Sequence, residues 1–138
     1  MRAGSKPGFY MDLIEKIGEI ARKDGRYSAE AFMFLLRALD FTAKRVVKRD
    51  PPEHVTAGEL LEGVRRLGLA EFGYLAPAVF EQWGVKTTRD FGEIVFTLVE
   101  EGLMGKTERD SIEDFDAVYD FEEVFQKSFE VDWDQILP

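Results

Sequence analysis

Residues 32–41 are apolar on nearly every side of a helix, and this segment constrains the fold more than any other. A helix that is apolar all round must be covered by other elements, because exposed apolar surface is unfavourable in water. We therefore predict a central helix that begins after Ser28 as its N-cap and ends near Lys48. Tyr27 and Phe32 occupy the two positions of a hydrophobic staple across its first turn.

Four further segments have apolar residues at helical spacing, with typical start and stop residues at their ends. These segments are residues 10–25, 56–72, 74–84 and 87–102. Thr87 and Thr88 are both candidates for the N-cap of the last one. The apolar faces predict a shared core that includes Val55, Leu60, Val64, Phe91, Ile94, Val95 and Leu98.

The helix after Thr56 has a capping box, because Glu59 stands three residues after the threonine. Gly63 and Gly68 lie inside its apolar pattern, and each glycine weakens a helix by about 1 kcal/mol relative to alanine. Two explanations are open: another backbone approaches closely there, or the helix breaks near Gly68.

Residues 82–102 resemble a helix-turn-helix, with Gly84 in the turn and a threonine cap on the second helix. Two strand-like segments follow, Leu103–Thr107 and Ala117–Phe121, and together they predict a β-hairpin that would form a wing. The predicted fold is thus mainly α, a five-helix domain whose part from 56 to 121 is winged-helix-like.

The length of 138 residues corresponds to one domain. We expect a flexible leader at 1–9, a helical domain at 10–125 and an acidic tail at 126–138, with Met11 as a second candidate start. The chain has no cysteine, which excludes disulfides and thiolate metal sites. It also has no apolar run long enough for a membrane span and no signal peptide, so we expect a cytoplasmic protein without a membrane partner.

The net charge of −9 lies entirely in residues 107–138, which hold 11 acidic and 2 basic side chains. A basic patch is predicted earlier in the chain, at Lys44, Arg45, Lys48 and Arg49. Residues 85–106, which contain the candidate recognition helix, have a net charge of −1. This charge disfavours nucleic acid as a partner, because a recognition helix and wing must contact phosphates.

No motif in the chain supports catalysis or cofactor binding. Gly105–Thr107 lacks the earlier glycine of a phosphate-binding loop, since position 100 is Glu100. The acidic run from Asp110 has no frame that places oxygen ligands, glycine and glutamate as an EF-hand does. His54 could act as a general base only with a nucleophile, and the chain has no nucleophile motif, so we expect a local packing or capping role for it. For Asp40 we expect an ion pair on the helix surface. We predict no catalytic residue, cofactor or metal.

Several short motifs resemble a bacterial conserved-hypothetical family of about 140 residues, found in planctomycetes and verrucomicrobia. The resemblance covers residues 11–125 and implies the domain boundaries but no activity. The motifs that carry it are Asp24-Gly25-Arg26-Tyr27, Ala31-Phe32-Met33-Phe34, His54-Val55-Thr56, Glu59-Leu60-Leu61-Glu62-Gly63, Trp83-Gly84-Val85, Asp90 to Phe96, Gly105-Lys106-Thr107, Asp114-Phe115 and Tyr119-Asp120-Phe121.

The sequence therefore predicts a non-enzymatic protein-interaction module, a subunit or adaptor of a larger assembly. Its candidate contact residues are aromatic and acidic: Phe129, Asp132, Trp133 and Asp134. The tail could instead fold back on the basic ends of the first two helices. The alternative function is a winged-helix-like, nucleic-acid-associated regulator that uses the basic patch.

Overall fold

The structure, a computed structural model, describes residues 1–3, 10–47, 54–106 and 109–127. It is mainly helical, as predicted, and its helices are α1 (Tyr10–Asp24), α2 (Ala29–Arg45), α3 (Ala57–Phe72), α4 (Ala76–Gln82) and α5 (Thr88–Glu100). The shorter elements are β1 (Arg2–Ala3), β2 (Met104–Gly105), the 3-10 helices η1 (Gly73–Leu75) and η2 (Ile112–Phe115), and a π-helix η3 (Glu122–Lys127).

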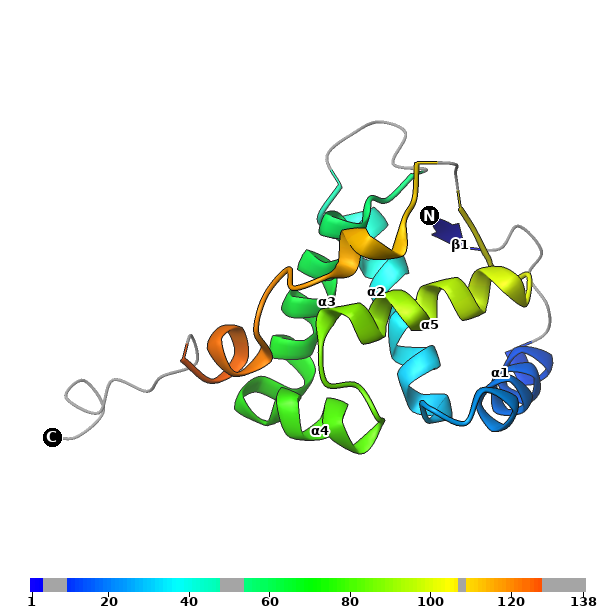
Figure 1. The fold of residues 1–138 in the computed structure, drawn as a ribbon, viewed down its shortest axis with the longest axis horizontal. Helices are drawn as coiled ribbons and strands as arrows, with labels where there is room; N and C mark the ends of the chain where they lie inside the picture. Colours follow the sequence, from blue (N-terminus) through cyan, green and yellow to red (C-terminus); the bar gives the residue numbers. More distant parts are fainter. Residues whose placement is uncertain (4–9, 48–53, 107–108, 128–138) are drawn as a thin grey trace, which may run out of the picture.

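Helix α2 lies at the centre, between α1, α3 and α5 (Figure 1). This confirms the central helix, although it ends at Arg45 and not near Lys48. The predicted staple forms, since the rings of Tyr27 and Phe32 pack edge to face with centroids 6.3 Å apart. Ser28 is the N-cap residue, but its buried hydroxyl finds no hydrogen-bond partner among the described residues. The staple thus holds this helix start without a side-chain cap.

Helix α3 begins with the predicted capping box, in which Glu59 N donates to Thr56 Oγ1 over 3.1 Å. The helix continues to Phe72, so it does not break at Gly68. A Cβ at Gly63 would lie 1.7 Å from Thr42 Oγ1 and 3.4 Å from the Ala38 carbonyl oxygen. Close approach of α2 explains the first glycine. At Gly68 the neighbours are the rings of two phenylalanines, in α4 and η3.

Helices α4 and α5 meet at a tight turn at Gly84, whose φ is 91°. Thr87 is the N-cap residue of α5, which settles the choice between the two threonines. The predicted core forms as one cluster, since all seven of its residues are buried. At its centre Phe80 of α4 packs against a ring of aromatic side chains: Phe34, Phe72, Trp83, Phe91, Phe121 and Phe125.

The predicted hairpin is wrong. Strand β2 pairs with β1 in antiparallel register, Arg2 with Gly105 and Ala3 with Met104, and residues 117–121 form no strand. The physical reason is aromatic burial: Phe121 is buried in the core, and the hydroxyl of Tyr119 donates to the Leu61 carbonyl oxygen over 2.7 Å. These contacts hold residues 117–121 against α3 and α4, away from β2.

The structure describes both ends of the predicted domain in part. Within the segment expected as a flexible leader, Arg2–Ala3 form β1, and the buried Met1 donates from its amino group to the Val55 carbonyl oxygen over 3.0 Å. At the other end the described chain continues through η3 to Lys127. The tail from 128 onward lies outside the described residues, as do 4–9. Within the described part, no helix is both long and apolar enough to cross a membrane.

Candidate interaction surface

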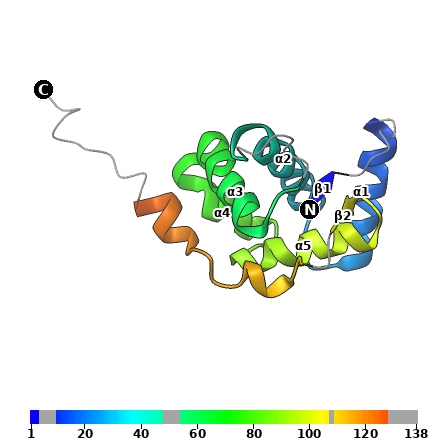
Figure 2. The ribbon, with the colours of Figure 1, turned by 90° about the horizontal axis from the view of Figure 1, so that it is seen from above.

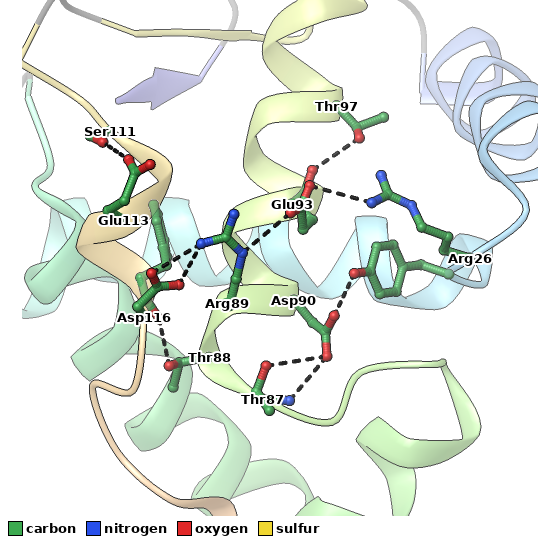
Figure 3. Close-up of polar contacts among 12 residues, drawn as sticks. Arg26, Thr87, Thr88, Arg89, Asp90, Glu93, Thr97, Ser111, Glu113 and Asp116 are labelled. Atoms are coloured by element: carbon green, nitrogen blue, oxygen red, sulfur yellow. Dashed lines mark hydrogen bonds and ion pairs between the residues drawn. The ribbon is translucent and has the colours of Figure 1, made fainter.

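The polar face of α5 is covered by ion pairs (Figure 3). Arg89 Nη1 lies 2.7 Å from Asp116 Oδ1, and Arg89 Nε lies 3.5 Å from Glu93 Oε1. Both carboxylates favour the charged guanidinium, and the pKa of Arg89 is raised, chiefly by its hydrogen bond to Asp116. The one cation that α5 presents is therefore held by two anions of the same domain.

Asp90 occupies the amino end of α5. Its Oδ2 accepts hydrogen bonds from the backbone N of Lys86 over 2.8 Å and of Thr87 over 3.1 Å, and its Oδ1 accepts from the Tyr27 hydroxyl over 2.6 Å. Burial and this last bond raise the pKa of Tyr27. The Asp90 carboxylate thus occupies the two backbone donors that directly precede α5.

The basic residues that follow α1 are paired in the same way. Arg26 Nη2 lies 2.7 Å from Asp24 Oδ1, and its Nη1 lies 3.3 Å from Glu93 Oε2. Lys23 Nζ lies 3.5 Å from Glu101 Oε1. Lys23, Arg26 and Arg89 are therefore all engaged with carboxylates of the domain, whereas Arg22, also exposed on the last turn of α1, has no ion pair among the described residues.

The predicted basic patch is described only in part. Lys44 Nζ lies 3.0 Å from Asp40 Oδ2, one helical turn away, and both side chains are exposed. This is the surface role predicted for Asp40. Arg45 is exposed on the last turn of α2. Lys48 and Arg49 lie outside the described residues, so the structure does not show the four cations as one cluster.

The apolar surface residues gather at a different place. Tyr74 is 53% exposed and Leu75 is 63% exposed, and Ala78 beside them on α4 is exposed as well. We call residues 74–79 the α4 corner. Of the large apolar side chains that the structure describes, only two other residues, Ile14 and Val118, are exposed, and each stands apart from the corner in sequence.

The sequence analysis did not single out the α4 corner. The spacing of the residues indicates the corner. Ala76 and Phe80 are four residues apart and share one helical face, whereas Tyr74 and Ala78 lie on another face. In the structure Ala76 and Phe80 are both fully buried. The predicted contact residues Phe129, Asp132, Trp133 and Asp134 lie outside the described residues.

His54 lies at the edge of the core, where its Nδ1 is 3.0 Å from the Met1 amino nitrogen and its Nε2 is 3.7 Å from Asp110 Oδ1. These contacts tie β1 to the start of α3 and to the acidic loop, in keeping with the packing role predicted for it. In the described part of the chain, no three His, Asp or Glu side chains form a group that could hold a metal ion.

A cleft of about 560 Å³ lies at the start of α5 and is lined by Lys86, Thr87, Thr88, residues 117–121 and Glu123. Its lining carries one cation, Lys86, and two carboxylates, Asp120 and Glu123, a net charge of −1 that does not favour an anionic ligand. Thr88 Oγ1 donates to the Phe115 carbonyl oxygen over 2.6 Å and accepts from Val118 N over 3.2 Å, which makes this threonine a structural link.

The comparisons give no further guide to the site. No family model, no curated protein and no solved structure matches the chain. The resemblance to a bacterial family therefore stays a prediction.

Proposed function

We propose that this protein is a non-enzymatic interaction module, a subunit or adaptor of a larger assembly, that binds another protein through its acidic C-terminal region and the α4 corner. One observation carries the proposal: η3, where the described acidic region ends at Lys127, packs against α4 and η1, and η1 carries exposed Tyr74 and Leu75. Figure 2 shows η3 in orange at the end of the described chain. Apolar and aromatic side chains that remain exposed together are typical of protein-binding surfaces.

The ion pairs of the folded domain favour protein binding by the acidic region over a role in which it covers the domain's own basic residues. The sequence left open that the tail covers the basic ends of the first two helices. Lys23, Arg26 and Lys44 already pair with carboxylates of the folded domain. In addition, α2 ends beside the start of α3, whereas η3 contacts η1, which follows the end of α3. The tail thus starts at the far end of the α2–α3 pair.

The alternative function is a nucleic-acid-associated regulator in which α4, the turn at Gly84 and α5 act as a helix-turn-helix without the predicted wing. The observation that favours it is exposed Arg45, for which the structure gives no ion pair among the described residues. A phosphate contact at the end of α2 would be strongest at low salt. Titration of labelled duplex DNA at ~50 mM salt tests it, and absence of binding would reject it.

The main proposal is tested by affinity capture from native cells with four forms of the full chain. These forms are the unchanged chain, Tyr74→Ser with Leu75→Ser, Phe129→Ser with Trp133→Ser, and the control Ile14→Ser, which changes an exposed apolar side chain on α1. We expect specific proteins to be retained by the unchanged chain and the control and lost from both double variants. Identical sets of proteins from all four forms would refute the proposal.

A further inference from the structure

We propose that the partner segment which docks on the α4 corner is a basic amphipathic helix, with apolar side chains on one face and lysine or arginine on either side. This inference rests on the proposed function and specifies the chemistry of the partner. Three properties of the described surface support it: the shape of the apolar face, the lack of a cover and the sign of the nearby charges.

The corner offers an apolar face of about two helical turns. Residues 74–79 continue from η1 into α4 and rise roughly 9 Å along a helical axis. Leu75 and Ala78 are three residues apart and therefore adjacent on the surface. An amphipathic helix that lies in a groove or on a face anchors through apolar residues at the same spacing. The dimensions of the corner match one such set of anchors.

The described residues leave this face open. Helix α4 packs against α3, η1 and η3, and it does so through Ala76 and Phe80, which are both fully buried. The large exposed fractions of Tyr74 and Leu75 show that these contacts do not cover the other side. Tyrosine is suited to such a position, since its ring supplies apolar area and its hydroxyl can stay hydrated.

The charges around the corner are negative. Glu81 is exposed on α4 itself, and Glu122 and Glu123 are exposed on η3, where Lys127 is the one basic residue. Glu71 lies at the end of α3 and pairs with Arg37. A cationic partner is therefore favoured, and an anionic one is repelled.

The same charges argue against the chain's own tail as the occupant. Residues 128–138 have apolar side chains that could cover the corner, but they would bring further carboxylates next to Glu81 and Glu122. Exposed ion pairs contribute little individually. We therefore expect the apolar anchors to set the affinity, and the carboxylates to set orientation and association rate.

The test measures the binding of a fluorescently labelled, 18-residue synthetic peptide of leucine and lysine to the full chain by anisotropy. Its leucines lie on one helical face. The control peptide has the same composition with the leucines spread around the helix. We expect the amphipathic peptide to bind, and Tyr74→Ser with Leu75→Ser to weaken it by ~10-fold or more, as loss of central anchors does. The matched variant Val118→Ser should change the affinity less than ~2-fold.

A second pair of variants tests the charges. Glu81→Gln with Glu122→Gln should lower the association rate and flatten its salt dependence, whereas Glu15→Gln with Glu30→Gln, exposed carboxylates on α1 and α2, should not. Circular dichroism checks that every variant is folded. The inference is overturned by equal binding of the two peptides, or by an unchanged affinity of the Tyr74/Leu75 variant.

Two further outcomes would assign the corner to another occupant and also overturn the inference. Tighter peptide binding by Phe129→Ser with Trp133→Ser would show that the tail covers the corner. Self-association of the unchanged chain in sedimentation, abolished by the Tyr74/Leu75 variant, would show a second copy. The proposed function and this inference can fail separately. If the proteins captured from cells do not compete with the peptide for the chain, the inference is refuted and the proposed function is not.

Discussion

Substitution of Gly63 by alanine should destabilise the protein, although alanine is the better helix former. The added Cβ would lie 1.7 Å from Thr42 Oγ1 and 3.0 Å from Thr42 Cβ. Thr42 cannot move freely, because it is fully buried and its hydroxyl donates to the Ala38 carbonyl oxygen over 2.6 Å. The substitution must therefore displace α2 from α3 or break this hydrogen bond.

The magnitude follows from three contributions. Overpacking of a dense core costs about 1–3 kcal/mol. Loss of the Thr42 hydrogen bond costs about 1 kcal/mol. The higher helix propensity of alanine stabilises the helix by about 1 kcal/mol and offsets part of this cost. We expect Gly63→Ala to lower the free energy of unfolding by about 1–3 kcal/mol, and a loss of 1 kcal/mol corresponds to a fall in melting temperature of about 4 °C for a domain of this size.

A matched control lies on the same helix. A Cβ at Gly58 would meet nothing within 4 Å, so Gly58→Ala should leave the stability unchanged or raise it by up to about 1 kcal/mol. Urea denaturation followed by circular dichroism measures both variants. Thr42→Ala removes Thr42 Oγ1, the atom closest to the added Cβ. In the double variant it should restore part of the free energy of unfolding lost in Gly63→Ala, with a coupling energy between the two substitutions of about 1–2 kcal/mol. A Gly63→Ala variant as stable as Gly58→Ala would refute the close approach of α2 and α3.

Three other substitutions test the contacts around α5 and η3. Burial and the bond to Asp90 raise the folded-state pKa of Tyr27 above its unfolded value of about 10, so the stability that this group contributes is lost as the pH rises above about 10. Tyr27→Phe should reduce this alkaline loss in urea titrations, and an unchanged pH profile would contradict the assignment. Thr88→Val should cost about 1–3 kcal/mol in the same assay, because it leaves the Phe115 carbonyl oxygen without its donor, and a neutral effect would remove the structural link. Phe125→Ala should cost about 3–5 kcal/mol and detach η3, measurable as faster amide exchange there, and protection equal to that of the unchanged chain would show that Phe125 does not hold η3.

The helices could be predicted from the sequence because their determinants are local. The Tyr27 staple, the capping box at Thr56 and the stop at Gly102 all act within one or two turns of the chain. The shared core follows from the same periodicity, since α1, α3 and α5 each have one apolar face and α2 is apolar on nearly every side. Ser28 shows the limit of this reasoning: it stands at the N-cap position, yet tertiary packing has buried its hydroxyl without a partner.

The strand-like segment predicted at Leu103–Thr107 contains β2, but its partner strand could not be predicted, because a two-residue pairing has no periodic signal. Met104–Gly105 pairs with residues about 100 positions earlier in the chain. The expected hairpin partner, residues 117–121, has alternating residues that suit a strand. Its aromatic side chains pack instead against Phe80 of α4 and Phe125 of η3. Long-range aromatic packing overrode a local preference for strand.

The distribution of charge along the chain could be predicted from the sequence, but the ion pairs between distant residues could not. Composition alone predicts an acidic C-terminal region and a more basic start. It does not predict that Arg26 reaches Glu93, sixty-seven residues further along the chain, or that Arg89 reaches Asp116. In both pairs an arginine already has a carboxylate partner within the domain, which weakens the proposal that these arginines contact phosphates.

The spacing of Ala76 and Phe80 indicates which face of α4 is buried, but not that the opposite face stays uncovered, because burial depends on position in the fold. The seven residues of α4 include one charged side chain, Glu81, so α4 resembles residues 32–41 in being apolar on most sides. Both segments predict burial by the same rule. Helix α2 satisfies the rule because it contacts α1, α3 and α5, whereas α4 leaves Ala78 exposed beside Tyr74 and Leu75 of η1. Exposed apolar side chains that stand together are typical of protein-binding surfaces, and this is the physical basis of the proposal that the corner binds a protein.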